Sequence, residues 1–156
     1  DVLRTVGHKL GRPTRIALVG ARPEEVAGAA QRLSEGEAGE IVLVEHGYHD
    51  DWSAVLENLG AARPDVLVLG LGAPREMLWV REHRAELPPC LVMTCGGWFG
   101  FLSGTEARAP KLLRRSGLEW IARSAQAPRR LLPRYLKGMV SVAVLAAGIL
   151  LERVRR

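Results

Sequence analysis

The feature that most constrains the fold of this chain is the stretch of residues 66–79, which reads VLVLGLGAPREMLW. Four apolar, partly β-branched residues in a row indicate a strand buried on both faces, because helices cover both faces of a parallel sheet. Gly70 and Gly72 permit a sharp turn after this strand, and Pro74 suits the first turn of a helix. A strand, a glycine turn and a helix N-terminus in this order also form a natural site for an anion.

Other parts of the chain repeat this alternation of a short apolar run and a helical pattern. We expect strands at residues 14–19, 41–44, 66–69 and 89–94, and helices at residues 1–10 and 23–33, from Asp50 or Asp51 to residue 59, and from Pro74 onward. Four successive βα units predict a Rossmann-like parallel sheet with helices on both faces. We expect residues 1–105 to form this Rossmann-like, ligand-binding domain and residues 106–156 to form a basic, helical, membrane-associating appendage.

The carboxyl ends of the predicted strands should meet at one edge of the sheet, where folds of this class bind ligands. Glycine is frequent there, and a backbone without Cβ atoms can approach a phosphate or a sugar closely. A tight turn in any α/β protein is the alternative reason for such glycines. The candidate ligand contacts are Gly20, Gly47, Tyr48, Gly70, Gly72, Pro74, Glu76, Gly96, Gly97 and Phe99.

Charge is distributed unevenly along the chain. Residues 106–156 contain 12 lysines and arginines and three acidic residues, whereas residues 1–105 contain 10 and 14. A basic appendage indicates an anionic partner, such as a membrane surface, a nucleic acid or a diphosphate. Nucleic acid is disfavoured because the few aromatic residues are not interleaved with the basic ones. The candidates for contact with a diphosphate or a membrane are Arg123, Arg129, Arg130, Arg134 and Lys137.

Residues 139–151 form an apolar run interrupted only by Ser141 and followed by three arginines. The run is shorter than the roughly 20 residues that a membrane-spanning helix needs. Its basic flanks favour a helix that lies in the membrane interface, and an ordinary core helix is the alternative. We therefore expect a peripheral membrane protein.

Two other chemistries are weakly supported. Gly70 and Gly72 are followed by Arg75 where a dinucleotide fingerprint has its third glycine, which disfavours an NAD-dependent oxidoreductase. His46 and His49 precede two aspartates, but a polar loop before a helix explains them better than a metal site with no second set of ligands. We expect neither a metal nor a cofactor.

Cys90 and Cys95 are the two cysteines of the chain. Their odd spacing places them on opposite sides of a strand, so they cannot pair with each other. A chain without disulfides fits a reducing cytoplasm.

Several motifs, taken in their order along the chain, resemble the WecG/TagA/CpsF glycosyltransferases, also called glycosyltransferase family 26. The first is VLGLGAP at residues 68–74, with Trp79 after it. The others are CGGWFGFLSG at residues 95–104, ARAP at residues 107–110, GLEW at residues 117–120, and APRRL at residues 127–131 with Arg134 and Tyr135.

The resemblance implies the transfer of a hexose of the N-acetylmannosamine type from a UDP-sugar to a polyprenyl-diphosphate-linked acceptor. It implies an inverting, metal-independent enzyme of cell-surface polysaccharide synthesis at the cytoplasmic face of the membrane. The appendage would dock on the anionic membrane surface and contribute arginines to the diphosphate. A second copy of the chain is a further candidate partner.

The chain departs from the pattern of the family in several places. Glu76 and Met77 stand where members usually have Gln and Glu, Gly100 stands for an Asp, and Pro133 replaces an arginine. The candidate catalytic Asp of the family would lie in a segment before Asp1, so no residue of this chain is assigned the catalytic role. These departures support an alternative, a non-catalytic, membrane-associated remnant that still binds a nucleotide sugar. A carboxylate at Glu76 should repel a diphosphate, so Glu76→Gln should tighten its binding.

Overall fold

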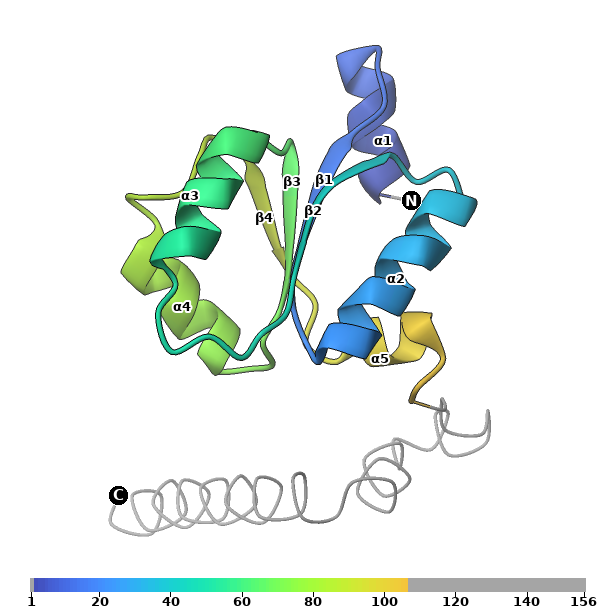
Figure 1. The fold of residues 1–156 in the computed structure, drawn as a ribbon. Helices are drawn as coiled ribbons and strands as arrows, with labels where there is room; N and C mark the ends of the chain where they lie inside the picture. The colour runs from blue at the N-terminus through green and yellow to red at the C-terminus, as the bar shows by residue number, and fades with distance from the viewer. Residues whose placement is uncertain (1, 107–156) are drawn as a thin grey trace, which may run out of the picture. The chain divides into compact units, whose positions relative to one another are not determined.

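Four parallel strands form the centre of the fold, in the spatial order β2-β1-β3-β4. The computed structural model describes residues 2–106. The strands are β1 (Arg15–Gly20), β2 (Glu40–Glu45), β3 (Val66–Gly70) and β4 (Leu91–Thr94), and the helices are α1 (Val2–Leu10), α2 (Pro23–Glu35), α3 (Ser53–Ala62), α4 (Arg75–His83) and α5 (Trp98–Ser103) (Figure 1). The predicted Rossmann-like parallel sheet is therefore confirmed.

The strands begin and end within two residues of the predicted positions. Helix α5 was not predicted, because its six residues lie in a motif rich in glycine and aromatic residues that has no clear helical period. The chain divides into two units, Asp1–Ala107 and Arg108–Arg156, and the described residues belong to the first. The predicted helical appendage lies outside them, apart from Glu106.

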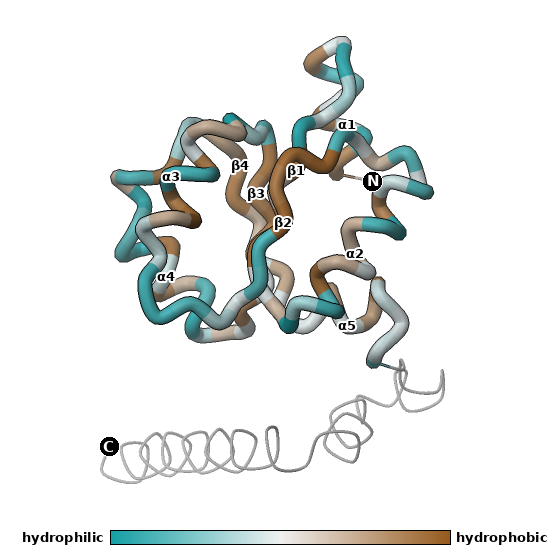
Figure 2. Tube along the Cα trace, in the orientation of Figure 1, coloured by the Kyte–Doolittle hydropathy of each residue, from teal (hydrophilic) through white to brown (hydrophobic). Residues whose placement is uncertain are grey.

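The two central strands are buried on both faces, as the sequence pattern predicts. Their side chains alternate between the layer of α1, α2 and α5 and the layer of α3 and α4 (Figure 1). The first layer receives Ile16, Leu18, Val66 and Val68, and the second receives Ala17, Val19, Leu67 and Leu69. Figure 2 shows these strands as the most hydrophobic part of the trace, between helices whose outer turns are hydrophilic. Sheet and helices thus share two separate hydrophobic cores.

The direction of the chain reverses between β1 and β3. From β1 the chain leads through α2 to β2 at one edge, and α3 then returns it to β3 on the other side of β1. The two strands pair in register from Ile16 and Val66 to Gly20 and Gly70. The loops that follow them lead to helices on opposite faces, which is the arrangement that opens a crevice in folds of this class.

Gly20 and Gly70 lie in direct contact at the end of this pairing. Gly20 has a φ of +134°, and a Cβ atom added to it would lie 2.5 Å from the carbonyl carbon and oxygen of Gly70. Beyond the pair, the Ala21 N–H donates to the Gly70 carbonyl oxygen at 2.9 Å, and the Gly47 N–H donates to the Ala21 carbonyl oxygen at 2.9 Å. The main chain therefore joins the loops after β1, β2 and β3.

Gly20→Ala is expected to lower the free energy of unfolding by about 2 kcal/mol or more, because a Cβ would overlap the Gly70 peptide and strain the backbone. Urea denaturation of the whole chain measures this loss. The matched control is Gly60→Ala, since Gly60 is an exposed helical glycine with no atom within 4 Å of an added Cβ. The control should be as stable as the wild type or more stable, and equal losses in both variants would contradict the close contact.

Candidate functional site

Loops after all four strands meet at the edge where the carboxyl ends of the strands lie (Figure 1). The predicted contact residues divide here into a surface group and a buried group. Those that reach the surface at least in part are Tyr48, Gly72, Pro74, Gly96 and Gly97, and those that are buried are Gly20, Gly47, Gly70, Glu76 and Phe99. The predicted basic contacts Arg123, Arg129, Arg130, Arg134 and Lys137 lie outside the described residues.

The buried glycines have a packing reason to be glycine. A Cβ atom at Gly47 would lie 2.8 Å from the Leu71 side chain, and one at Gly70 would lie 2.7 Å from the ring of Phe99. Phe99 is 0% exposed, and its ring packs against the end of β3 at Gly70. The tight-turn explanation that the sequence left open therefore applies to this group.

Gly72 and Gly96 differ from the buried glycines in having open space around them. An added Cβ would meet no atom within 4 Å at either position, but both residues have positive φ angles, +78° and +57°. Glycine is required here by backbone conformation, since other residues rarely adopt this region. Both N–H groups point to one acceptor, the Oε2 atom of Glu76, at 3.0 Å from Gly72 and 3.1 Å from Gly96.

The Glu76 side chain is therefore an internal partner of two loops. It lies in the first turn of α4, where the helix dipole favours a negative charge, and the residue is only 4% exposed. The sequence placed Glu76 at the site but predicted repulsion between its carboxylate and a ligand. Two N–H donors now satisfy this carboxylate, and no local pattern could have revealed a contact with Gly96, 20 residues further along the chain.

Cys95 lies near both this carboxylate and the end of β3. Its sulfur would be 3.1 Å from a Cβ at Gly70. Burial, and then the nearby charge of Glu76, raise the pKa of the Cys95 thiol to about 12. Burial also raises the pKa of the Cys90 thiol, which belongs to the core on the other face of the sheet. Both cysteines are free, as predicted, and both thiols are protonated at neutral pH.

A row of aromatic rings supports the edge on the α3 and α4 side. His46 and His49 stack in parallel with ring centroids 4.2 Å apart, and the row continues at 4.9 Å to Trp52, 5.3 Å to Trp79 and 4.9 Å to His83. Sequence reasoning identified His46 and His49 as a polar loop and missed the row, because its members come from two elements that meet only in the folded chain.

Short-range hydrogen bonds to side chains stabilise the β2–α3 loop. The Nδ1 atom of His46 accepts a hydrogen bond from the Tyr48 N–H at 3.1 Å, and the Tyr48 residue is 59% exposed. Asp51 accepts hydrogen bonds from the Ser53 N–H and hydroxyl at the start of α3, and these bonds lower the pKa of its carboxyl group. Within residues 2–106, no three His, Cys, Asp or Glu side chains gather as metal ligands would.

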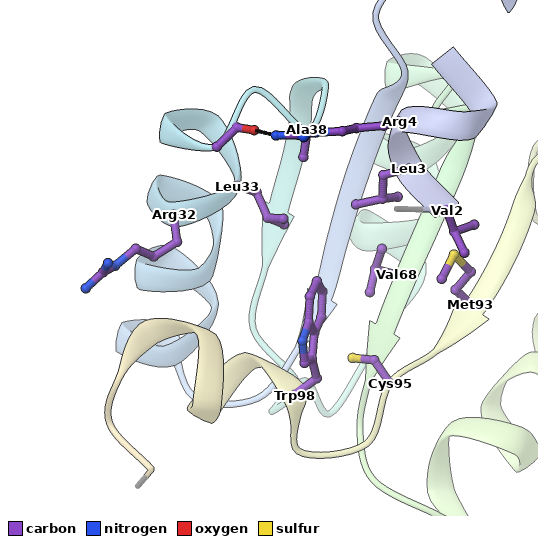
Figure 3. Close-up of a pocket in the computed structure, with 11 residues that line it drawn as sticks. Val2, Leu3, Arg4, Arg32, Leu33, Ala38, Val68, Met93, Cys95 and Trp98 are labelled. Atoms are coloured by element: carbon purple, nitrogen blue, oxygen red, sulfur yellow. Dashed lines mark hydrogen bonds between the residues drawn. The ribbon is translucent and has the colours of Figure 1, made fainter. Parts of the chain in front are cut away.

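A cavity of about 410 Å³ lies behind this edge, on the α2 side of the sheet. Figure 3 shows Val68 and Met93 along the sheet, Leu33 on α2, and Trp98 and Cys95 toward the strand ends. Arg4 and Gly36 also line the cavity, and Arg4 donates a hydrogen bond to the Gly36 carbonyl oxygen. The residues that line the cavity come from elements far apart in the sequence, so no sequence motif indicated the cavity.

Comparison with known proteins supplies the context for this geometry. A family model described as "Glycosyl transferase WecG/TagA/CpsF family" matches residues 1–156, which is the whole chain.

The raised thiol pKa predicts slow alkylation of Cys95. In a Cys90→Ser background at pH 8, iodoacetamide should modify Cys95 at least about tenfold more slowly in the native protein than in urea, because the thiolate is the reacting form. Mass spectrometry over time measures both rates. Equal rates in the two states would show that the Cys95 thiol is neither buried nor held protonated by the fold.

Proposed function

The chain belongs to the WecG/TagA/CpsF family of glycosyltransferases, and from this premise we propose that its strand-end edge binds a UDP-sugar as the glycosyl donor. The observation that carries the proposal is the convergence of glycine loops at the switch between β1 and β3. Gly72, Gly96 and Gly97 reach the surface there, and a backbone without Cβ atoms lets a phosphate or a sugar approach closely. Tyr48 in the loop after β2 is 59% exposed and offers an aromatic surface to a nucleobase at the same edge.

The proposed reaction transfers a hexose of the N-acetylmannosamine type, with inversion, to a hydroxyl group of a polyprenyl-diphosphate-linked acceptor. The acceptor hydroxyl loses its proton as it attacks the anomeric carbon, and UDP leaves with the bonding electron pair. A base must take that proton. Cys95 is unsuited to this role because its thiol is protonated, and Glu76 is unsuited because its carboxylate is buried and accepts two N–H groups. We assign the base to no described residue.

A second candidate function is binding of the nucleotide sugar without transfer. The observation that favours it concerns Gly100, where the resemblance leads one to expect an aspartate. A Cβ atom at Gly100 would lie 2.9 Å from the Cγ atom of Glu106, so an aspartate would fit at this position only if the Glu106 side chain moved. The position therefore lacks the carboxylate that the family pattern has there. Transfer of labelled sugar to a polyprenyl-diphosphate-linked acceptor separates the two candidates, because the second predicts UDP-sugar binding with no labelled product.

We further propose that the chain acts as a peripheral protein at the cytoplasmic face of the membrane. Among residues 2–106, no helix is long and apolar enough to cross a bilayer. The support for membrane contact comes from the sequence of the appendage, where five basic residues from Arg123 to Lys137 precede the apolar run of residues 139–151. Such a sequence suits both an anionic lipid surface and the diphosphate of a lipid-linked acceptor.

Isothermal titration of UDP tests the donor site. The wild-type chain should bind UDP, and Gly97→Val should weaken binding by about tenfold or more, equivalent to about 1.4 kcal/mol, because a branched side chain blocks the approach to this loop. Gly60→Val is the matched control, since Gly60 lies in α3, outside the strand-end loops. Equal affinity in all three proteins, or no binding by any of them, would refute the site.

Liposome flotation tests the membrane contact. Deletion of residues 138–156 should abolish binding to liposomes of any charge, because burial of apolar side chains contributes a salt-insensitive free energy. Joint replacement of Arg129, Arg130 and Arg134 by glutamine should weaken binding only to anionic liposomes and most at low salt, since each basic group contributes about 1 kcal/mol that salt screens. An intact chain that stays free of anionic liposomes at low salt would contradict this proposal.

A further inference from the structure

Among the described residues, no main-chain hydrogen bond beyond the end of the sheet joins the β4–α5 loop to the other three strand-end loops. The last bond of the β3–β4 ladder is donated by the Cys95 N–H to the Leu69 carbonyl oxygen at 2.8 Å. The next donor along the chain is the Gly96 N–H, and its partner is the Glu76 side chain. By contrast, main-chain hydrogen bonds through Ala21 join the other three loops.

We infer that Glu76 is a positioning residue whose side-chain oxygen joins the β3–α4 and β4–α5 loops so that Gly97 faces the donor. The inference rests on the proposed UDP-sugar site. The N–H groups of Gly72 and Gly96 then bind Glu76, and a phosphate of the donor would be bound by other groups of the same edge.

Three observations support this assignment. One oxygen, Oε2, accepts from both loops at 3.0 and 3.1 Å, distances typical of good hydrogen bonds. The residue is 4% exposed, so a ligand would have to displace a buried carboxylate from two donors to use them. Both glycines have φ angles that other residues rarely adopt, which indicates that the loops are shaped to aim these N–H groups at one point.

The carboxylate could have one of two roles, and these predict opposite effects of its removal on donor binding. If Glu76 positions the loops, its removal frees both N–H groups and weakens donor binding. If instead Glu76 competes with a substrate phosphate for the same two donors, its removal tightens donor binding. The burial of the residue and its short contacts with both loops favour the positioning role. Under that role Glu76→Gln should leave UDP affinity close to the wild-type value, because the amide oxygen still accepts both N–H groups.

The experiment compares the wild type, Glu76→Gln, Glu76→Ala and the control Glu82→Gln, which removes an exposed carboxylate from the same helix. Amide hydrogen exchange of Gly72 and Gly96, followed by NMR, reports the two bonds directly, and UDP titration reports the site. Each protein is measured with and without sodium formate, whose carboxylate can replace the one that Glu76→Ala removes.

We expect the wild type, Glu76→Gln and Glu82→Gln to protect both amides and to bind UDP similarly. Glu76→Ala should lose both protections and bind UDP on the order of tenfold more weakly, because the two loops would no longer be held together and the binding-competent arrangement would be populated only in part. Formate should restore both properties in Glu76→Ala and change neither in the wild type. Rescue by a small anion separates this role from a general loss of stability, which formate would not repair.

Other outcomes overturn the inference. Tighter UDP binding by Glu76→Ala, with formate as a competitor of UDP, would show that Glu76 occupies the phosphate site itself. Protected amides in Glu76→Ala would show that the carboxylate does not hold the loops. If Glu76→Ala fails to fold, lost protection in Glu76→Gln overturns the inference instead. A wild type that binds no UDP would refute the donor site, while the exchange data would still decide whether Glu76 joins the loops.

Discussion

The parallel pairing of β1 with β3 is the constraint on which the rest of the described structure depends. These two strands are buried on both faces, and nearly all their residues are apolar. Fully burying one side chain of this kind contributes about 1.5–3 kcal/mol, so a row of them on each face makes the register of this pair the most strongly determined feature of the sheet. The helices on either side are then placed by the alternation of the strand side chains.

The same register brings Gly20 to Gly70 at the carboxyl edge, and this contact shapes the candidate site. The β1 and β3 backbones approach so closely there that no side chain fits between them. Through Ala21 and Gly47, main-chain hydrogen bonds extend this rigid contact into the next loop. Glycines that a sequence pattern associates with a ligand thus serve first to let the loops pack, and the surface glycines Gly72, Gly96 and Gly97 remain as the candidates for ligand contact.

The polar part of the edge is organised by side chains that satisfy one another. Glu76 accepts N–H groups from two loops, and its charge raises the pKa of the neighbouring Cys95 thiol. On the α3 and α4 side of the sheet, the aromatic row from His46 to His83 packs beside the loop that carries Tyr48. Under the proposed function, these side chains would hold the donor site in place and take no part in bond breaking themselves.

The sequence by itself determined the alternation of strands and helices, the burial of residues 66–69, the opposite faces of Cys90 and Cys95, and the edge at which the glycines gather. These features depend on local periodicity and on the chemistry of single residues, which a linear pattern contains. Only the tertiary structure decided what the individual residues do there. The bond from Glu76 to Gly96, the contact of Gly20 with Gly70, the aromatic row and the cavity beside Met93 all join segments that are distant in the chain. They exist because the strands are arranged in the order β2-β1-β3-β4, and that order depends on how the separate hydrophobic faces pack together.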